Sequence, residues 1–239
     1  MKKLLAIALL LPLFTLSQKK NVINTFRVMP KPEKITEFEK ALTNHAQKYH
    51  TGDWKWRVFE VQSGPESGFY HVVEGPNSWD DIDGRKDISA EHTADWNKNV
   101  APLTTGAGMS GFNLFREDLS TVQLTDYSDK IAITHIFPKV GYTDKVEEIL
   151  KKVKKAWEAG NQTVAVYEAS SSGPAQFGLV FRYKQGLKER NSDFRKPLKE
   201  RYNTVNGEDS FDSYLQAVRD YIDKAWSELL FGRADLSSK

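Results

Sequence analysis

The chain has 239 residues, of which 39% are hydrophobic and 28% charged, with a formal net charge of +2. This length suffices for one large domain or two small ones. Because the chain contains no cysteine, it has no disulfide framework, no thiolate metal site and no thiol nucleophile.

The first residues are typical of a secretory signal peptide. Lys2 and Lys3 precede an apolar run from Leu4 to Phe14, and small or neutral residues follow before Gln18. The run is interrupted by Pro12 and is shorter than the roughly 20 residues that span a bilayer. We therefore predict a signal peptide over residues 1–17 and a periplasmic or secreted mature protein without an integral membrane segment. Loss of Lys2 and Lys3 removes the net positive charge, so we predict no nucleic-acid partner.

The residues after the leader indicate the order β-α-β-β-α-β. β-branched and apolar runs predict strands, and apolar residues spaced three and four apart predict helices. The predicted elements are strands 22–29, 54–62, 69–74 and 109–116, with helices 35–49 and 88–100.

The second half of the chain repeats this pattern. The segment RVMPKPEKITEFEKAL, which begins at Arg27, resembles HIFPKVGYTDKVEEIL, which begins 108 positions later at His135. Two further anchors return in the same order: Ser63-Gly64-Pro65 as Ser172-Gly173-Pro174, and Arg116–Ser120 as Arg233–Ser237. We predict a first repeat over 18–120, a linker over 121–129 and a second repeat over 130–239.

The second repeat has the same predicted order of elements. These are strands 131–137, 163–169, 177–183 and 229–233, a helix over 143–159, and helices between 189 and 226. Apolar residues occupy both faces of the strands: Trp56 and Val58 alternate with Phe59 and Val61. Strands of this kind are buried on both sides. The predicted class is α+β, with two tandem ferredoxin-like repeats packed sheet to sheet as an intrachain pseudo-dimeric barrel, and with a monomer as the oligomeric state.

This pattern resembles the dimeric α+β barrel superfamily in a fused form. The resemblance rests on the tandem topology and on a strand, a Pro-Lys pair and an amphipathic helix, which open each repeat at Pro30-Lys31 and Pro138-Lys139. It covers nearly all of the mature chain. The superfamily includes antibiotic-biosynthesis monooxygenases, haem-degrading monooxygenases, NIPSNAP-like proteins and small stress-responsive barrels. Because these functions are diverse, the resemblance implies a fold but no single activity.

Differences between the repeats indicate where a function could lie. His45 lies on the apolar stripe of its helix where the second repeat has Val153, and Trp54 and Trp56 correspond to Thr163 and Ala165. We predict a small apolar or aromatic ligand in a helix–sheet cavity of the first repeat. The candidate ligand-binding residues are His45, His92, Trp96, Trp54, Trp56 and His71. The alternative is that His45 is a hydrogen-bonded core histidine and that the tryptophans fill volume.

Haem is the alternative cofactor, and it is implied by the resemblance alone. Haem-degrading members of the superfamily have an asparagine on the first strand, a tryptophan near the second helix and an iron-binding histidine on that helix. The matching candidates here are Asn24, Trp79 and His92.

No catalytic residue can be assigned from the sequence. G-x-S-x-G and H-E-x-x-H are absent, and His45 and His50 are five residues apart and so do not share a helix face. No metal site is therefore predicted. Two functional classes remain: a binding protein without turnover or cofactor, and a monooxygenase-like enzyme, either cofactor-free or haem-handling.

Overall fold

The computed structural model describes residues 19–239. The predicted signal peptide lies outside this range. In the first half the elements are β1 (Val22–Pro30), α1 (Ile35–Tyr49), β2 (Trp56–Ser63), β3 (Tyr70–Asn77), α2 (Trp79–Asp83), α3 (Ala90–Asp95), a π-helical turn η3 (Trp96–Val100) and β4 (Thr104–Phe115). The 3-10 turns are η1 (Pro32–Lys34), η2 (Gly52–Trp54) and η4 (Ala101–Leu103).

The second half has the same order. Its elements are β5 (Lys130–Pro138), α4 (Thr143–Ala159), β6 (Val164–Ala169), β7 (Phe177–Arg182), a 3-10 turn η5 (Leu187–Arg190), α5 (Leu198–Asn206), α6 (Ser210–Tyr221) and β8 (Ile222–Gly232). Among the described helices, none is long and apolar enough to cross a bilayer.

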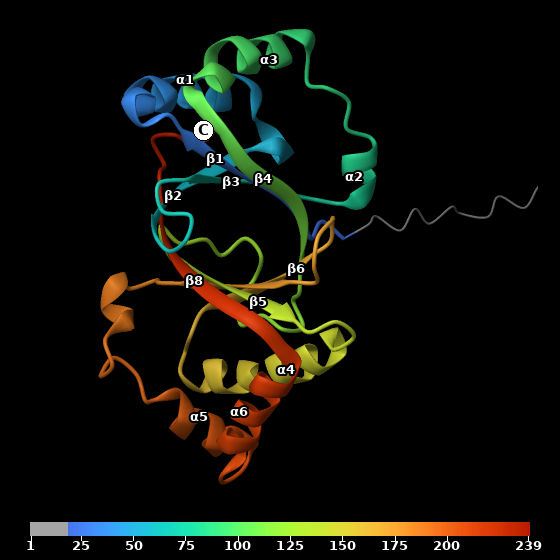
Figure 1. Ribbon diagram of the computed structural model, residues 1–239, viewed down its shortest axis with the longest axis vertical. Helices are drawn as coiled ribbons and strands as arrows, with labels where there is room; N and C mark the ends of the chain where they lie inside the picture. The colour runs from blue at the N-terminus through green and yellow to red at the C-terminus, as the bar shows by residue number, and fades with distance from the viewer. Residues whose placement is uncertain (1–18) are drawn as a thin grey trace, which may run out of the picture.

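The eight strands form one closed barrel in the order β1-β3-β2-β8-β5-β7-β6-β4. The pairs β2–β8 and β4–β6 join strands of different halves, so neither sheet keeps a free edge. Figure 1 shows α1 and α3 outside one sheet, and α4, α5 and α6 outside the other. The inner faces of the two sheets therefore cover each other, which confirms the predicted fold class.

Two strands are longer than the sequence indicated. β4 begins at Thr104, where a glycine-rich stretch has low strand propensity, and it pairs with β1 along most of its length. β8 begins at Ile222, so Trp226, which the sequence placed in a helix, lies in a strand opposite His135. Strand pairing overrides local preference in both cases.

The strand register corrects one correspondence between the halves. Trp56 lies opposite Glu74 in β2–β3, and Val164 lies opposite Phe181 in β6–β7. Trp56 therefore corresponds to Val164 rather than to Ala165. Successive strand residues alternate between faces, and a shift of one residue places Ala165 inside the barrel.

After β4 and after β8 the chain crosses to the helix layer of the other half. We call Arg116–Ser120 and Arg233–Ser237 the exchanged segments. Leu119 packs in the core of the second half, and Leu236 packs in the core of the first. The Ser120 hydroxyl accepts a hydrogen bond from the Val166 N–H at 2.8 Å. The Ser237 hydroxyl accepts the equivalent bond from the Val58 N–H at 3.0 Å.

Each exchanged segment begins with an arginine that binds carboxylates of the other half. Arg116 Nη1 donates to Glu147 and to Glu168, both at 2.7 Å. Arg233 contacts Glu39 and Glu60 in the same way. The guanidinium of Arg116 lowers the pKa of Glu147, and that of Arg233 lowers the pKa of Glu39, although burial opposes both effects. The recurring Arg-x-Asp-Leu-Ser motif is therefore a reciprocal clasp between the halves.

Replacing the clasp arginines should destabilise the fold. Arg116→Met or Arg233→Met leaves two carboxylates of the other half without their charge-assisted partner, so we expect a loss of about 1–3 kcal/mol in the free energy of unfolding. Urea denaturation at pH 7 measures it. Since Glu39 and Glu147 have depressed pKa values, their contribution to the free energy of unfolding is present above the pH that equals their unfolded pKa, about 4.3. It is lost as the pH falls below that value. The exposed Arg219→Met is the control. Equal stability of the clasp variants and the wild type at pH 7 would contradict the clasp.

Candidate functional site

The interior of the barrel contains a cavity of about 580 Å³. All eight strands contribute to its lining, and its size is within the usual range for small-molecule sites. We call it the lumen. Much of its wall is apolar, from Ile23, Phe59, Val73, Ile131, Ile133 and Val180.

One wall of the lumen carries a buried ionic network around Glu228 on β8. The Glu228 carboxylate is bound by both terminal nitrogens of Arg27 and by His135 Nε2, the last at 3.0 Å. Arg27 also pairs with Glu66 at 3.3 Å. Burial opposes ionisation of Glu228, but the hydrogen bond from His135 and the charge of Arg27 keep its pKa below the ordinary value. The network is therefore charged and internally compensated.

His135 is fixed within this network by its other nitrogen. Its Nδ1 accepts a hydrogen bond from Gln176 Nε2 at 2.6 Å, and its ring stacks on Trp226 at a centroid distance of 4.0 Å. Both ring nitrogens are thus occupied by protein partners.

His71 also lines the lumen, and it has fewer hydrogen-bond partners than His135. Its Nδ1 is buried without a hydrogen-bond partner. Burial, and then the positive charge of Arg27, hold the pKa of His71 well below 6.5. The imidazole is therefore neutral near pH 7 and offers one donor and one acceptor.

A second polar group surrounds Tyr127 in the segment between the halves. The Arg57 guanidinium lies 3.7 Å from the centroid of the Tyr127 ring, and that of Arg182 lies 5.5 Å from it. Arg182 donates to the Tyr167 hydroxyl at 3.1 Å and to backbone carbonyls, and Arg57 donates to the Gly75 carbonyl at 3.1 Å. Within residues 19–239, neither arginine forms an ion pair with a carboxylate. This part of the lumen is therefore positively charged.

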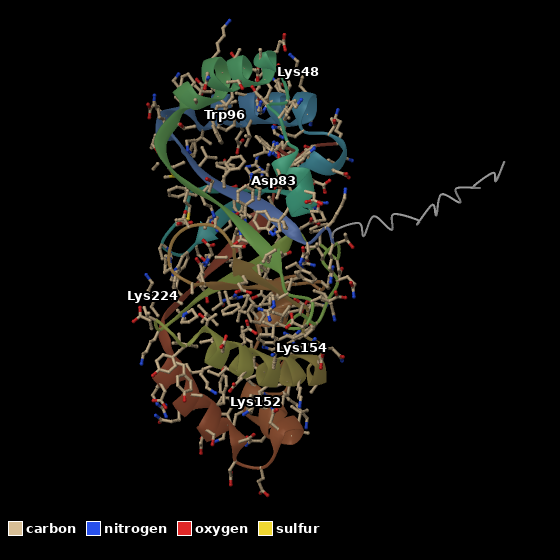
Figure 2. All side chains as sticks on the ribbon, turned by 90° about the vertical axis from the view of Figure 1, so that its right-hand side faces the viewer. Lys48, Asp83, Trp96, Lys152, Lys154 and Lys224 are labelled. Carbon is tan, nitrogen blue, oxygen red and sulfur yellow. The ribbon has the colours of Figure 1, made fainter. Side chains whose placement is uncertain are left out.

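Four of the predicted ligand-binding residues lie together outside the barrel. The ring centroid of His45 lies 4.8 Å from that of His92, 5.5 Å from that of Trp56 and 5.3 Å from that of Trp96. The group occupies the layer between α1, α3 and the sheet of the first half, where Figure 2 labels Trp96. Its rings pack against one another. In the second half Val153 is part of an apolar core.

The other two predicted residues lie elsewhere. Trp54 ends η2 before the strand begins, and the Arg85 guanidinium lies 4.3 Å from its ring centroid. His71 is on β3 and faces the lumen. Ligand binding by these six residues stays a prediction.

Comparison with known proteins supports the fold. No protein-family model and no curated protein matches the chain. Solved structures resemble it over most of both chains, among them the following three. A putative monooxygenase from Fusobacterium nucleatum subsp. nucleatum is 14% identical, with a TM-score of 0.54, and the match covers 88% of this chain and 91% of that one. An anthrone oxidase-like protein is 13% identical, with a TM-score of 0.54 and coverage of 90% and 92%. A putative chlorite dismutase is 9% identical, with a TM-score of 0.55 and coverage of 90% and 96%.

This is the dimeric α+β barrel fold. At these identities the likeness extends to the fold and not to an activity. The structure of this α+β barrel agrees with the resemblance inferred from its sequence.

The haem alternative can be tested against the geometry of the α+β barrel. Asn24 on β1 lies opposite Phe112 on β4, and the Phe112 ring contacts Trp79 at a centroid distance of 5.6 Å. His92 lies on α3, which Figure 1 shows apart from α2 and its Trp79.

His92 packs among other ring side chains of the first half. Its Nδ1 lies 3.3 Å from Asp87 Oδ1, and the rings of His45, Tyr49 and His50 lie within 5.4 Å of its own. The three candidates therefore lie on separate elements, and haem binding by Asn24, Trp79 and His92 stays a prediction.

Several residues of the lumen and of its ionic network were missed from the sequence. Trp226 and Glu228 were hidden because their segment was assigned to a helix or to the turn after it. The sequence did contain a signal for Arg27 and His135, because they occupy equivalent positions, 108 residues apart, in otherwise apolar strands. A basic residue retained in both copies of a buried strand indicates a polar group facing the barrel interior.

Removing the charge of Glu228 should destabilise the fold. Glu228→Gln leaves the Arg27 cation buried with Glu66 alone, and we expect a loss of about 3 kcal/mol in the free energy of unfolding, as for other broken buried pairs. Thermal and urea denaturation measure it. Because the pKa of Glu228 is depressed, the contribution is present above its unfolded value and is lost on acidification. Glu66→Gln, at the more exposed partner, should cost less. A Glu228→Gln variant as stable as the wild type would show that the network is not needed for folding.

Proposed function

We propose that the protein binds a small, mainly apolar molecule carrying one acidic group in the lumen of the barrel. The observation that carries the proposal is the pair Arg57 and Arg182, two guanidinium groups without a carboxylate partner beside an apolar cavity of about 580 Å³. Arg182 is buried and Arg57 is half-buried, and a guanidinium removed from water without a counter-ion has a desolvation cost that an anionic ligand would offset.

The acidic group would bind Arg57, since the hydrogen bonds of Arg182 are already taken up by carbonyls and by Tyr167. The apolar body would lie along Val73 and Val180. His71 would supply a neutral polar contact, because its Nδ1 has no partner within the protein.

The same groups favour binding over turnover. A general base works best with a pKa near the operating pH. The depressed pKa of His71 makes it a hydrogen-bond partner rather than a proton acceptor, and both nitrogens of His135 are occupied. A monooxygenase-like reaction is the alternative for the same cavity, supported by likeness of fold alone.

Two naphthalene probes distinguish the contribution of the apolar cavity to ligand binding from that of the Arg57 charge. We expect 1-anilinonaphthalene-8-sulfonate, an apolar anion, to bind one site with a rise in fluorescence. Gly178→Phe should abolish this binding, because a Cβ at Gly178 meets nothing within 4 Å and a phenyl ring there enters the lumen. Arg57→Gln should weaken it roughly tenfold or more through loss of a charge-assisted contact. The neutral N-phenyl-1-naphthylamine should lose affinity only in Gly178→Phe.

Arg219→Gln, on the outer surface of α6, is the control and should match the wild type with both probes. Unchanged sulfonate binding in Gly178→Phe would place the site outside the lumen and overturn the proposal. Native mass spectrometry of the protein as isolated would identify a retained ligand. Oxygen consumption in the presence of that ligand would support a monooxygenase-like reaction instead of binding without turnover.

We also propose that the protein acts outside the cytoplasm, on the basis of residues 1–17. When the full chain is expressed in a bacterium, the N-terminal residue of the exported protein should be Gln18. Leu9→Arg interrupts the apolar run and should retain the uncleaved chain in the cells, as followed by fractionation and mass spectrometry. An uncleaved wild-type chain in the cytosol would contradict export.

A further inference from the structure

Three histidines of the first half meet in the layer between the helices and the sheet. His45 is on α1, His50 is the C-cap residue directly after α1, and His92 is on α3. One ring nitrogen from each lies within 4.8 Å of the other two. His45 and His50 are each only 1% exposed. Because His50 lies where the chain leaves the helix, the sequence argument about a shared helix face does not apply to it.

Each histidine is oriented by its own carboxylate. His45 Nδ1 lies 2.8 Å from Asp95 Oδ2, His50 Nδ1 lies 3.2 Å from Glu74 Oε2, and His92 Nδ1 lies 3.3 Å from Asp87 Oδ1. An Nδ1–H donated to a carboxylate fixes the tautomer and leaves the lone pair on Nε2. Carboxylates hold metal-binding histidines in this way.

The carboxylates are themselves held in place. Glu74 accepts hydrogen bonds from Trp56 Nε1 at 2.9 Å and from Arg85 Nη1 at 2.6 Å. Asn99 donates to Asp95 at 2.7 Å, and the Thr93 hydroxyl donates to Asp87 at 2.8 Å.

The nitrogens that remain are without partners. Nε2 of His45 and Nε2 of His50 are both buried and form no hydrogen bond. Buried polar atoms in proteins are normally satisfied. An unpartnered imidazole nitrogen of this kind is a common metal ligand.

The second half shows that the fold does not require this group. The positions that correspond to His45, Trp56 and Glu74 are Val153, Val164 and Phe181. These three residues pack in or against an apolar core. The same scaffold is thus stable with hydrocarbon where the first half has imidazole and carboxylate. A purely structural role for three histidines and three carboxylates would not explain the difference.

We propose that His45, His50 and His92 bind a divalent first-row transition-metal ion, with zinc as the reference ion, through their Nε2 atoms. Three imidazoles suit zinc, copper, nickel or iron, whereas calcium and magnesium prefer oxygen ligands. Zinc–nitrogen bonds of 2.0–2.1 Å place tetrahedral ligand atoms about 3.3 Å apart. The distances between the three ring nitrogens would therefore have to shorten by up to about 1.5 Å, which side-chain rotation allows.

The coordination would be incomplete within the protein. The described residues bring no fourth His, Cys, Asp or Glu into the group. His92 has the partly exposed side chain, so the fourth position would open on its side of the cluster. Trp56, stacked on His50 at a centroid distance of 3.5 Å, closes another side. Three histidines and one open position are the ligand set of zinc sites that activate water.

The test uses the untagged mature protein, stripped of metal by a chelator. Calorimetric titration should give one zinc per chain, and cobalt(II) should give the visible absorption bands of a four-coordinate ion. Zinc should also raise the unfolding midpoint of the wild type. His92→Ala, at the edge of the cluster, should lower zinc affinity at least 100-fold and remove the cobalt bands.

A second variant acts through the carboxylate and keeps all three ligands. Asp87→Asn should lower zinc affinity about 10–100-fold, as expected for the partner of a ligating histidine. Asp83→Asn, at the end of α2, is the matched control and should leave the affinity unchanged. No zinc binding by the stripped wild type, or equal affinity in the wild type and in His92→Ala, would overturn the proposal. Probe binding in the lumen is measured separately, so failure of one site leaves the other intact.

Discussion

The structure depends on two apolar sheet faces that cover each other. A four-stranded sheet with helices on one side exposes its other side to water, and here each half supplies the cover that the other lacks. Closure through β2–β8 and β4–β6 also removes the open strand edges. The exchanged segments lock the arrangement, because Leu119 and Leu236 each complete a core that belongs to the other half. The halves are therefore interdependent rather than independent domains joined by a linker.

This closure creates the lumen and determines its chemistry. Residues from both halves face the same enclosed space, so a polar side chain there must find its partner across the barrel. Glu228 meets Arg27 and His135 in this way, over long distances in the sequence. Arg57 and Arg182 lack a carboxylate among the described residues, and the proposed acidic ligand rests on this observation.

The helix layers have diverged, although the scaffold is the same. Around α4 the layer is apolar, with Val153 and Trp157 in the core. Around α1 it contains imidazoles held by carboxylates, next to the π-helical turn that begins at Trp96. Such turns often occur at functional sites. The two proposed sites are on opposite faces of the first sheet: the lumen lies on its inner side and the histidine cluster on its outer side.

The sequence by itself determined the order of elements, most of the correspondence between the halves and the need for burial on both strand faces. These follow from local periodicity and from repetition, which a single chain displays directly. It also indicated that the first half is the unusual one, since His45 lies at the position that corresponds to Val153 in the second half. Only the tertiary structure decided that His50 joins His45 and His92, that β8 extends back to Ile222, and that Glu228 faces Arg27. Those contacts join residues far apart in the chain through strand pairing and helix packing, and no local pattern of amino acids encodes them.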